Sequence, residues 1–227
     1  CVLPPHTLPA SILDEIRAAT RALALEFDVH GLLNVQYAVQ DGVVYVLEVN
    51  PRASRTVPFV SKATGVPLAK IATKVMLGKT LAELGIGGDP RHPGIAVKAP
   101  VLPFNRFPGV DVILGPEMKS TGEVMGIDTT VGVAFAKAQL AAGTELPAAG
   151  TVFLSVRDAD KAAILPVARR LHELGFRLVA TGGTARALAE AAVPVDHILK
   201  VSEGRPNVVD LMKNRAVQLI INTPTAG

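Results

Sequence analysis

The sequence predicts an α/β chain with two parts of different architecture. In the first part, helical patterns surround a hairpin of two extended runs, which is typical of an antiparallel or mixed sheet with helices. In the second part, strand and helix patterns alternate from residue 151 onward, which indicates a parallel βαβ sheet. The segment GTELPAAG at 143–150 separates the two parts, because glycine, proline and small residues cluster there. We therefore expect one domain over residues 1–143 and a second over residues 144–227 that is truncated at its end.

Composition narrows the classes of protein to consider. Of the 227 residues 49% are hydrophobic, and a net charge of +3 is spread over 23 basic and 20 acidic residues. This balance favours local anion sites and not a nucleic-acid groove, which needs clustered basic residues and stacking aromatics. The sequence shows no signal-peptide pattern and no apolar run of the roughly 18 residues that a membrane span requires. We expect a cytoplasmic protein with no nucleic-acid and no membrane partner.

Residues 9–27 predict the first helix, because apolar residues recur there at steps of three and four. Ser11 is the expected N-cap of this helix. Phe104 and Phe107 are expected in the core, and 115–126 is expected either to contact a ligand or to form a structural turn. The other elements expected before residue 143 are helices from Thr56 to Gly65 and from Pro67 to about Gly78, a Gly/Pro loop over 85–95, an extended segment over 96–102 and a helix over 128–142.

The hairpin at residues 34–50, NVQYAVQDGVVYVLEVN, alternates between apolar odd-numbered and polar even-numbered residues near both its ends. Apolar residues face apolar residues across the hairpin if the loop has three residues, with Val39 opposite Val43 and Gly42 in a left-handed conformation. This register is expected to bring three polar side chains onto one face: Gln36, Glu48 and Asn50.

Two arginines, Arg52 and Arg55, directly follow this hairpin. One carboxylate and two amides offer oxygen ligands that suit Mg²⁺, which takes few protein ligands and completes its shell with water and nucleotide phosphate. The two guanidinium groups suit planar oxyanions such as phosphate or carbamate. An ordinary edge hairpin with a solvated polar face has the same pattern, so the residues alone leave both interpretations open.

The strings VLEVNPRASRT, PFVSKATG, PVLPFNRFPGVD and LGPEMKSTGEVMG resemble the second ATP-grasp module of the large subunit of carbamoyl phosphate synthetase. The resemblance implies that residues 1–143 are the C-terminal half of an ATP-grasp domain. It implies that Gln36, Glu48 and Asn50 ligate Mg²⁺ or Mn²⁺ on ATP, with K⁺ as a possible further ion. It also implies that Arg52 and Arg55 line the site where carbamate meets the γ-phosphate.

The resemblance implies a glutamine-hydrolysing, ATP-dependent ligase that forms carbamoyl phosphate from bicarbonate, glutamine-derived ammonia and two MgATP, for pyrimidine and arginine biosynthesis. The implied partners are a glutaminase small subunit in a hetero-oligomer, the upstream half of the same large subunit, and bicarbonate or carbamate. The chain lacks an initiator Met and the family's upstream nucleotide-binding groups, so we expect a fragment that is inactive alone. The alternatives are a regulatory or nucleotide-binding fragment without an active metal site, and another ATP-grasp ligase.

The second part predicts strands at 151–156, 176–181, 197–201 and 216–223, and helices at 161–174, 182–192 and 207–214. Thr181-Gly182-Gly183-Thr184 joins a strand end to a helix start, where exposed amides and hydroxyls favour an anion. Ligands of parallel sheets bind beyond the carboxyl ends of the strands, so we expect a phosphate-containing ligand there. The polar residues at these ends are Ser155, Lys161, Thr181, Thr184, Lys200 and Asn222.

This part resembles the Rossmann-like, methylglyoxal-synthase-like allosteric domain that ends the same subunit. In that family, residues matching these six surround a nucleotide effector, UMP or IMP. Gly182 and Pro224 stand where some members have His and Thr, so the effector stays open. Methylglyoxal synthase activity is not expected, because the segment 203–207 lacks the catalytic Asp. Ala99 stands where the family often has a Glu that contacts ornithine, so ornithine activation is not expected.

Overall fold

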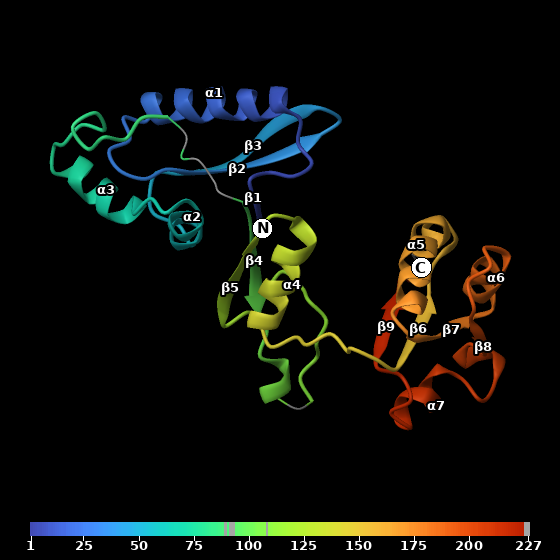
Figure 1. Ribbon diagram of the computed structural model, residues 1–227. Coiled ribbons are helices and arrows are strands. Elements are labelled where there is room, and N and C mark those ends of the chain that lie inside the picture. Colours follow the sequence, from blue (N-terminus) through green and yellow to red (C-terminus); the bar gives the residue numbers. More distant parts are fainter. Residues whose placement is uncertain (89, 91–93, 108, 225–227) are drawn as a thin grey trace. The chain divides into compact units, whose positions relative to one another are not determined.

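The computed structural model describes residues 1–88, 90, 94–107 and 109–224 (Figure 1). The chain divides into two compact units, Cys1–Thr144 and Glu145–Gly227, and the boundary expected after Gly143 falls one residue before this division. Part of the loop expected over 85–95 lies outside the described residues. Within the described ranges, no helix combines the length and the apolar character needed to cross a membrane.

The first unit contains β1 (Val2–Leu3), α1 (Ala10–Glu26), β2 (Asn34–Gln40), β3 (Val43–Asn50), α2 (Thr56–Thr64), α3 (Leu68–Met76), β4 (Ile95–Val101), β5 (Gly122–Asp128) and α4 (Val131–Ala141). Strands β1, β4 and β5 form an antiparallel sheet in that order, and β2 and β3 form a separate hairpin. Helix α4 packs on one face of the three-stranded sheet through the buried Ala134 and Ala138. Helix α2 packs on the other face through Phe59 and Ala63.

The apolar periodicity of residues 9–27 predicts helix α1 correctly, and this helix lies along the hairpin of β2 and β3 (Figure 1). The hydroxyl groups of Thr20 on α1 and Tyr37 on β2 share a hydrogen bond of 2.8 Å. The expected cap is wrong: the residue before the helix is Pro9, and Ser11 lies inside the first turn. Proline fixes an extended entry into the helix, so no side-chain cap is formed.

Strand β5 corrects the prediction for residues 115–126, because Gly122–Asp128 pairs along the whole of β4. The predicted helix over 128–142 accordingly begins three residues later, at Val131, with Thr130 as its N-cap. The strand was hidden by Gly126, which breaks the apolar alternation. A Cβ at Gly126 would lie 2.6 Å from the backbone nitrogen of Ala138, so only glycine lets β5 approach α4 this closely.

Phe107, which was expected in the core, and four large apolar residues of the helical segments are instead more than half exposed. In α4 the close approach at Gly126 selects the small alanine face, which turns Phe135 and Leu140 outward. Hydrophobic periodicity predicts a helix but does not show which side chains fit a narrow gap. The exposed fractions are 56% at Phe27, 62% at Met76, 56% at Phe107, 52% at Phe135 and 58% at Leu140.

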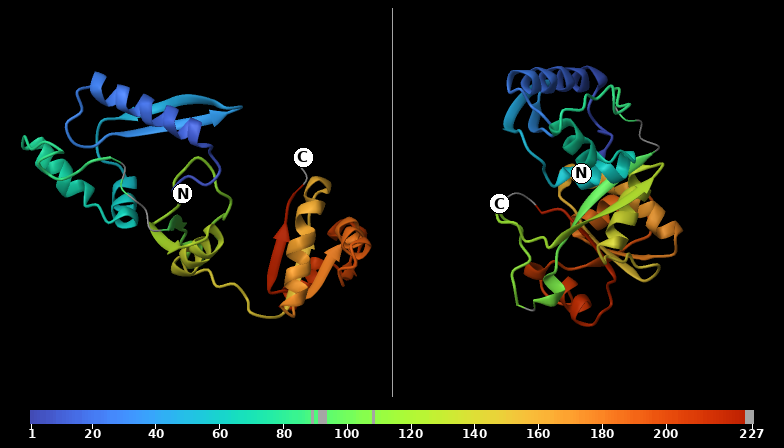
Figure 2. Two further views of the ribbon diagram at one scale, coloured as in Figure 1. Left: turned by 45° about the horizontal axis from the view of Figure 1, so that its top comes forward. Right: turned by 90° about the vertical axis from the view of Figure 1, so that its left-hand side faces the viewer.

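The second unit contains β6 (Thr151–Ser155), α5 (Lys161–Glu173), β7 (Arg177–Thr181), α6 (Gly182–Glu190), β8 (Asp196–Ile198), α7 (Val208–Lys213) and β9 (Leu219–Asn222). All strands are parallel in the order β8-β7-β6-β9, which confirms the predicted βαβ sheet. Helices α5 and α6 pack on one face and α7 on the other, and Figure 2 shows α5 running along the sheet. The chain order reverses at β6, and ligands of such sheets bind at this switch point.

Candidate functional site

The hairpin of β2 and β3 closes through a two-residue turn, with Gln40 opposite Val43. Both turn residues have positive φ angles, 52° at Asp41 and 78° at Gly42, as the tight turns that match strand twist require. The predicted three-residue loop with Val39 opposite Val43 is therefore wrong. Asp-Gly adopts two successive left-handed conformations more easily than most residue pairs, and this preference decides the turn.

Leu47 is an extra residue in β3 that shifts the pairing farther along the hairpin. Tyr37 lies opposite Val46, whereas Gln36 lies opposite Glu48, so a β-bulge separates these two pairs. The extra residue shifts even-numbered residues of β2 opposite even-numbered residues of β3. This shift was expected from a three-residue loop. Gln36 and Glu48 therefore do lie on one face, as predicted, but for a different reason.

Gln36 Nε2 donates a hydrogen bond of 2.9 Å to Glu48 Oε2, and both side chains are exposed. Asn50 lies two residues after Glu48, on the same face of β3 and opposite Asn34. We call Gln36, Glu48 and Asn50 the oxygen face. Within the described ranges, no group of three or more His, Cys, Asp or Glu side chains is placed to hold a metal. The oxygen face fits a hard cation in the kind of its donor atoms, provided that other ligands complete the shell.

The two predicted arginines lie between β3 and α2. Arg52 Nη1 donates to the carbonyl oxygen of Ala53 at 3.0 Å, and the Arg55 guanidinium contacts the sulfur of Met118. Neither arginine is ion-paired with another residue of the described ranges. Arg55 lines a cavity of about 320 Å³, to which no residue of the oxygen face contributes. The structure thus brings Gln36 and Glu48 together but does not bring the arginines into one cavity with them.

The segment 115–126, for which a ligand contact and a structural turn were both open, places one charged residue at a cavity and another in a loop. Glu123 lies on β5, lines the same cavity as Arg55 and pairs with Lys98 at 3.1 Å. Lys119 donates instead to two backbone carbonyls of the preceding loop, at 3.3 and 2.9 Å. Glu123 is therefore available at the cavity wall, whereas Lys119 stabilises the loop.

Ala99, where ornithine activation was not expected for lack of a glutamate, lies on β4. Its side chain is 3% exposed and packs against Ala134 and Ala138 of α4. The small side chain at this position fills the contact between strand and helix. The expectation about ornithine stays a prediction.

In the second unit, all six predicted effector residues line one cavity of about 560 Å³ at the carboxyl ends of the strands. Ser155 ends β6 opposite Asn222 at the end of β9, and Thr181 ends β7. The remaining wall comes from the segments that follow β6 and β9, from helix starts and from Lys200, which follows β8. The residues that line the cavity are Ser155, Val156, Arg157, Asp158, Lys161, Thr181, Gly183, Thr184, Lys200, Asn222, Thr223 and Pro224.

Two buried threonines fix the floor of this cavity. Thr184 Oγ1 accepts from the backbone nitrogen of Val156 at 3.0 Å and lies 3.3 Å from the carbonyl oxygen of the same residue. The hydroxyls of Ser155 and Thr181 share a hydrogen bond of 3.1 Å. Thr181 and Thr184 are 5% and 2% exposed, so their hydroxyls tie the ends of β6 and β7 to the start of α6.

Charged groups at the cavity are paired with carboxylates from the turn Asp158–Asp160. Lys161 Nζ lies 2.7 Å from Asp158 Oδ1, and Arg157 Nε lies 2.7 Å from Asp160 Oδ2. The hydrogen bond from Lys161 holds the pKa of Asp158 below its ordinary value, with the charges of Lys161 and Lys200 adding to this effect. The hydrogen bond from Arg157, followed by one from Thr223, likewise lowers the pKa of Asp160.

The segment 203–207 makes structural contacts. Glu203 Oε2 accepts from the backbone nitrogen of Lys200 at 2.8 Å. The buried Asn207 caps α7 through a hydrogen bond of 3.0 Å from the backbone nitrogen of Val209. No residue of this segment lines the cavity at the carboxyl ends of the strands. Its side chains therefore support the loop that carries Lys200.

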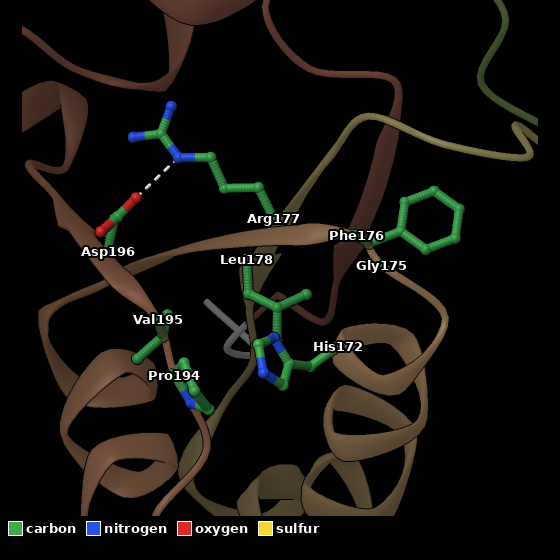
Figure 3. Close-up of a pocket in the computed structure, with 8 residues that line it drawn as sticks. All are labelled: His172, Gly175, Phe176, Arg177, Leu178, Pro194, Val195 and Asp196. Carbon is green, nitrogen blue, oxygen red and sulfur yellow. Dashed lines mark hydrogen bonds and ion pairs between the residues drawn. The ribbon is translucent and has the colours of Figure 1, made fainter.

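A second hollow of this unit, of about 260 Å³, lies at the amino ends of β7 and β8 (Figure 3). Arg177 Nε and Asp196 Oδ2 form an ion pair of 2.7 Å at its rim. The remaining wall is mainly apolar and includes Leu178 and Pro194, with the His172 ring beside them. The described residues of this lining carry no hydroxyl group, whereas the cavity at the carboxyl ends of the strands has four.

Sequence reasoning missed Arg157 and Asp158 among the cavity residues. Both follow the end of β6 within three residues of Ser155, which is the position that a parallel sheet turns toward its ligand. That signal was present in the sequence. The ion pairs of Arg157 with Asp160 and of Asp158 with Lys161 could not be read from it, because they depend on the one-turn helix Asp158–Asp160.

The comparisons with known proteins match both units. Residues 1–84 match the family model of the carbamoyl-phosphate synthase L chain, ATP binding domain, and residues 163–227 match that of the MGS-like domain. The biotin carboxylase domain of a single-chain bacterial carboxylase is 26% identical, with a TM-score of 0.40 over 44% of this chain and 24% of its own. This structural similarity is too low to support a conclusion.

Three relatives align over nearly the whole chain, and each is a carbamoyl phosphate synthase large chain. That of Mesorhizobium japonicum is 58% identical over 98% of this chain and 20% of its own length. That of Pasteurella multocida is 59% identical over 98% and 21%, and that of Archaeoglobus fulgidus 58% identical over 99% and 21%. The chain spans about a fifth of the length of these curated relatives. The two matched models and these identities show that the chain belongs to the carbamoyl phosphate synthase large-chain family.

Proposed function

We propose that this chain is the C-terminal part of an ATP-dependent, glutamine-hydrolysing ligase that forms carbamoyl phosphate from bicarbonate, ammonia and two MgATP. The observation that carries the proposal is the contact of Gln36 with Glu48 on one hairpin face, directly before two arginines. This hairpin lies inside the segment that matches the ATP-binding-domain model. The named relatives add support, since each is a carbamoyl phosphate synthase large chain.

The step that we assign to the first unit is the phosphorylation of carbamate. A carbamate oxygen attacks the γ-phosphorus of ATP, the bond to the β–γ bridging oxygen breaks, and ADP leaves. Gln36, Glu48 and Asn50 would hold Mg²⁺ or Mn²⁺, with K⁺ as a possible further ion. The bound metal neutralises phosphate charge. Gln36 now presents its Nε2 to Glu48, so its amide must turn to offer Oε1 to a cation.

Arg52 and Arg55 would offset the charge that develops on the transferred phosphoryl group. Neither is ion-paired within the described part of the chain, so their charge is not already spent on a carboxylate. Positioning and electrostatics supply most of the catalysis in phosphoryl transfer, and a planar guanidinium binds two oxygens of one group. Arg55 shares its cavity with Glu123, and the carboxylate of Glu123 is paired with Lys98.

The second unit would serve as the allosteric module for a nucleotide effector, UMP or IMP. Three observations support this: four hydroxyl groups and two lysines converge on one cavity, the start of α6 borders it, and the cavity lies at the switch point of a parallel sheet. In this proposal, Ser155, Lys161, Thr181, Thr184, Lys200 and Asn222 contact the effector.

The rest of the proposal follows from family membership. The chain would act with the upstream half of the same large subunit and with a glutaminase small subunit, in a cytoplasmic hetero-oligomer serving pyrimidine and arginine biosynthesis. By itself it would be inactive. The domain assignment, an ATP-grasp half over residues 1–143 and a methylglyoxal-synthase-like domain over 144–227, belongs to the same proposal.

The test replaces each arginine in the complete large chain, assembled with its glutaminase. Arg52→Met and Arg55→Met should each lower carbamoyl phosphate formation by about 100-fold or more, as the loss of a transition-state donor does. Arg21→Met, on the exposed side of α1, is the matched control and should leave the rate unchanged. Full activity of both arginine variants would show that the assignment of the phosphoryl site is wrong.

A further inference from the structure

Asp158 lines the effector cavity next to Lys161, whose positive charge would bind a phosphate. Its carboxylate lies 2.7 Å from Lys161 Nζ, and both residues line the cavity together with Lys200. The Asp158 side chain is 95% exposed, whereas that of Lys161 is 28% exposed. The lysine is therefore fixed in the wall, and the carboxylate can move away from it into solvent.

The ammonium group of Lys161 also lies against the start of α6. A Cβ at Gly183 would be 3.1 Å from Lys161 Nζ. Because glycine has no side chain, the ammonium group can lie close to the backbone at this position. Gly183 is in the first turn of α6, where free backbone amides attract anions. Lys161 thus joins the helix start to the carboxylate of Asp158.

The electrostatics indicate that this carboxylate interacts with more than one lysine. The pKa of Asp158 is lowered first by its hydrogen bond with Lys161, and further by the charges of Lys161 and Lys200. Arg157, a third cation in the lining, is occupied in the same way by Asp160. The turn Asp158–Asp160 therefore supplies internal counter-ions to the cavity.

We propose that Asp158 is an exchangeable counter-ion that a phosphate must displace from Lys161 in order to bind. This inference rests on the proposed effector site and concerns its regulation. Displacement opposes binding in two ways, because the Asp158–Lys161 pair is broken and the freed carboxylate stays close to a phosphate dianion. Asp158 thereby raises the effector concentration at which the second unit responds.

Displacement is feasible because an exposed ion pair contributes little stability. Solvent screens a pair of this kind, and a phosphate brings more charge and more acceptor oxygens than one carboxylate. The hydroxyls of Ser155 and Thr181 and the ammonium of Lys200 are further donors at the same cavity. A phosphate can use all of these groups, whereas the ion pair of Asp158 within the described ranges is with Lys161.

The test measures binding of UMP and of inorganic phosphate to the complete large chain by isothermal titration calorimetry. Asp158→Asn should bind both probes more tightly, by about three- to tenfold, because one nearby negative charge is removed. Asp196→Asn is the matched control: it removes the same charge from an ion pair of the same length, at the amino ends of the strands (Figure 3). Its affinities should stay within about twofold of the original, since salt screens distant charges.

A second experiment repeats Asp158→Asn in a chain that also carries Lys161→Met. It separates the displacement of Asp158 from Lys161 from a general effect of charge. In Lys161→Met the effect of Asp158→Asn should become smaller, because no ion pair remains to be exchanged and only the repulsion between the carboxylate and the phosphate is left. Unchanged or weaker binding by Asp158→Asn, with clear binding by the original chain, would overturn the counter-ion role and leave the effector site standing. If neither the original chain nor Asp158→Asn binds either probe, the effector site itself is refuted, and the counter-ion role with it.

Discussion

Gln36 and Glu48 lie directly opposite each other because Leu47 is an extra residue in β3. From the turn at Gly42, regular pairing would place Gln36 opposite Leu47. The bulge advances β3 by one position, so the carboxylate faces the amide at 2.9 Å. Two local irregularities, a left-handed turn and a bulge, thus determine the geometry of the oxygen face.

The turn predicts a measurable effect of Gly42→Ala. Gly42 has a φ of 78°, which an alanine adopts only with strain, so the free energy of local hairpin opening should fall by about 1 kcal/mol. Hydrogen exchange of peptides from residues 34–50 measures this opening. Gly87→Ala is the control, because Gly87 lacks a positive φ and has open space around its Cβ position. Equal exchange in both variants would contradict the two-residue turn.

The close contact of β5 with α4 predicts that Gly126 tolerates no side chain. Gly126→Ala should lower the free energy of opening of this sheet by about 1–3 kcal/mol, because a methyl group would meet the backbone of α4. Gly122→Ala, in the same strand and with open space around it, should change this free energy by less than about 1 kcal/mol. Hydrogen exchange in residues 95–101 and 122–128 compares the two. A harmless Gly126→Ala would mean that helix and strand are farther apart.

The floor of the effector cavity depends on one buried hydroxyl. Thr184→Val keeps the shape of the side chain but leaves the backbone nitrogen of Val156 without its acceptor. An unsatisfied buried donor costs about 1–3 kcal/mol, so the amide of Val156 should exchange faster. Thr184→Ser, which keeps the hydroxyl, should retain most of the protection. If valine and serine behave alike, the hydroxyl does not hold β6 to α6.

Asp128 predicts a pH dependence of the stability of the first unit. A hydrogen bond from Lys137, and then one from the backbone nitrogen of Thr129, hold its pKa below the ordinary value of 3.8. A depressed carboxyl pKa stabilises the folded state above the unfolded pKa, and this stabilisation is lost as pH falls through the folded pKa. The difference in melting temperature between the original chain and Asp128→Asn should be constant above about pH 5 and shrink below about pH 4. In Lys137→Met most of this difference should be gone at every pH.

The sequence was most informative where local chemistry alone decides the structure. The alternating pattern after residue 151 predicts the parallel sheet correctly, because each strand and helix there buries one complete apolar set. The six cavity residues could be found for the same reason, since their places at strand ends follow from topology. Gly65 as a helix stop is likewise local, with a φ of 73°.

The sequence was least informative where two elements meet. Strand β5 was not predicted, because Gly126 interrupts the alternation of apolar and polar residues. A glycine is needed there because α4 packs directly against the strand backbone. The bulge at Leu47 has no residue signature, and only the pairing of both strands reveals it. The partner of Arg55 is Met118, 63 residues away, a contact that no periodicity indicates.

The central claim is that the oxygen face holds the metal of a phosphoryl-transfer site. Its most direct test is ATP formation from carbamoyl phosphate and MgADP, the reverse of the assigned step, in the complete large chain with its glutaminase. Glu48→Gln should lower this rate by about 100-fold or more, because the single carboxylate of the oxygen face is lost. Glu26→Gln, an exposed residue at the end of α1, should not change it. A Glu48→Gln enzyme that forms ATP at the original rate with saturating Mg²⁺ would contradict the account.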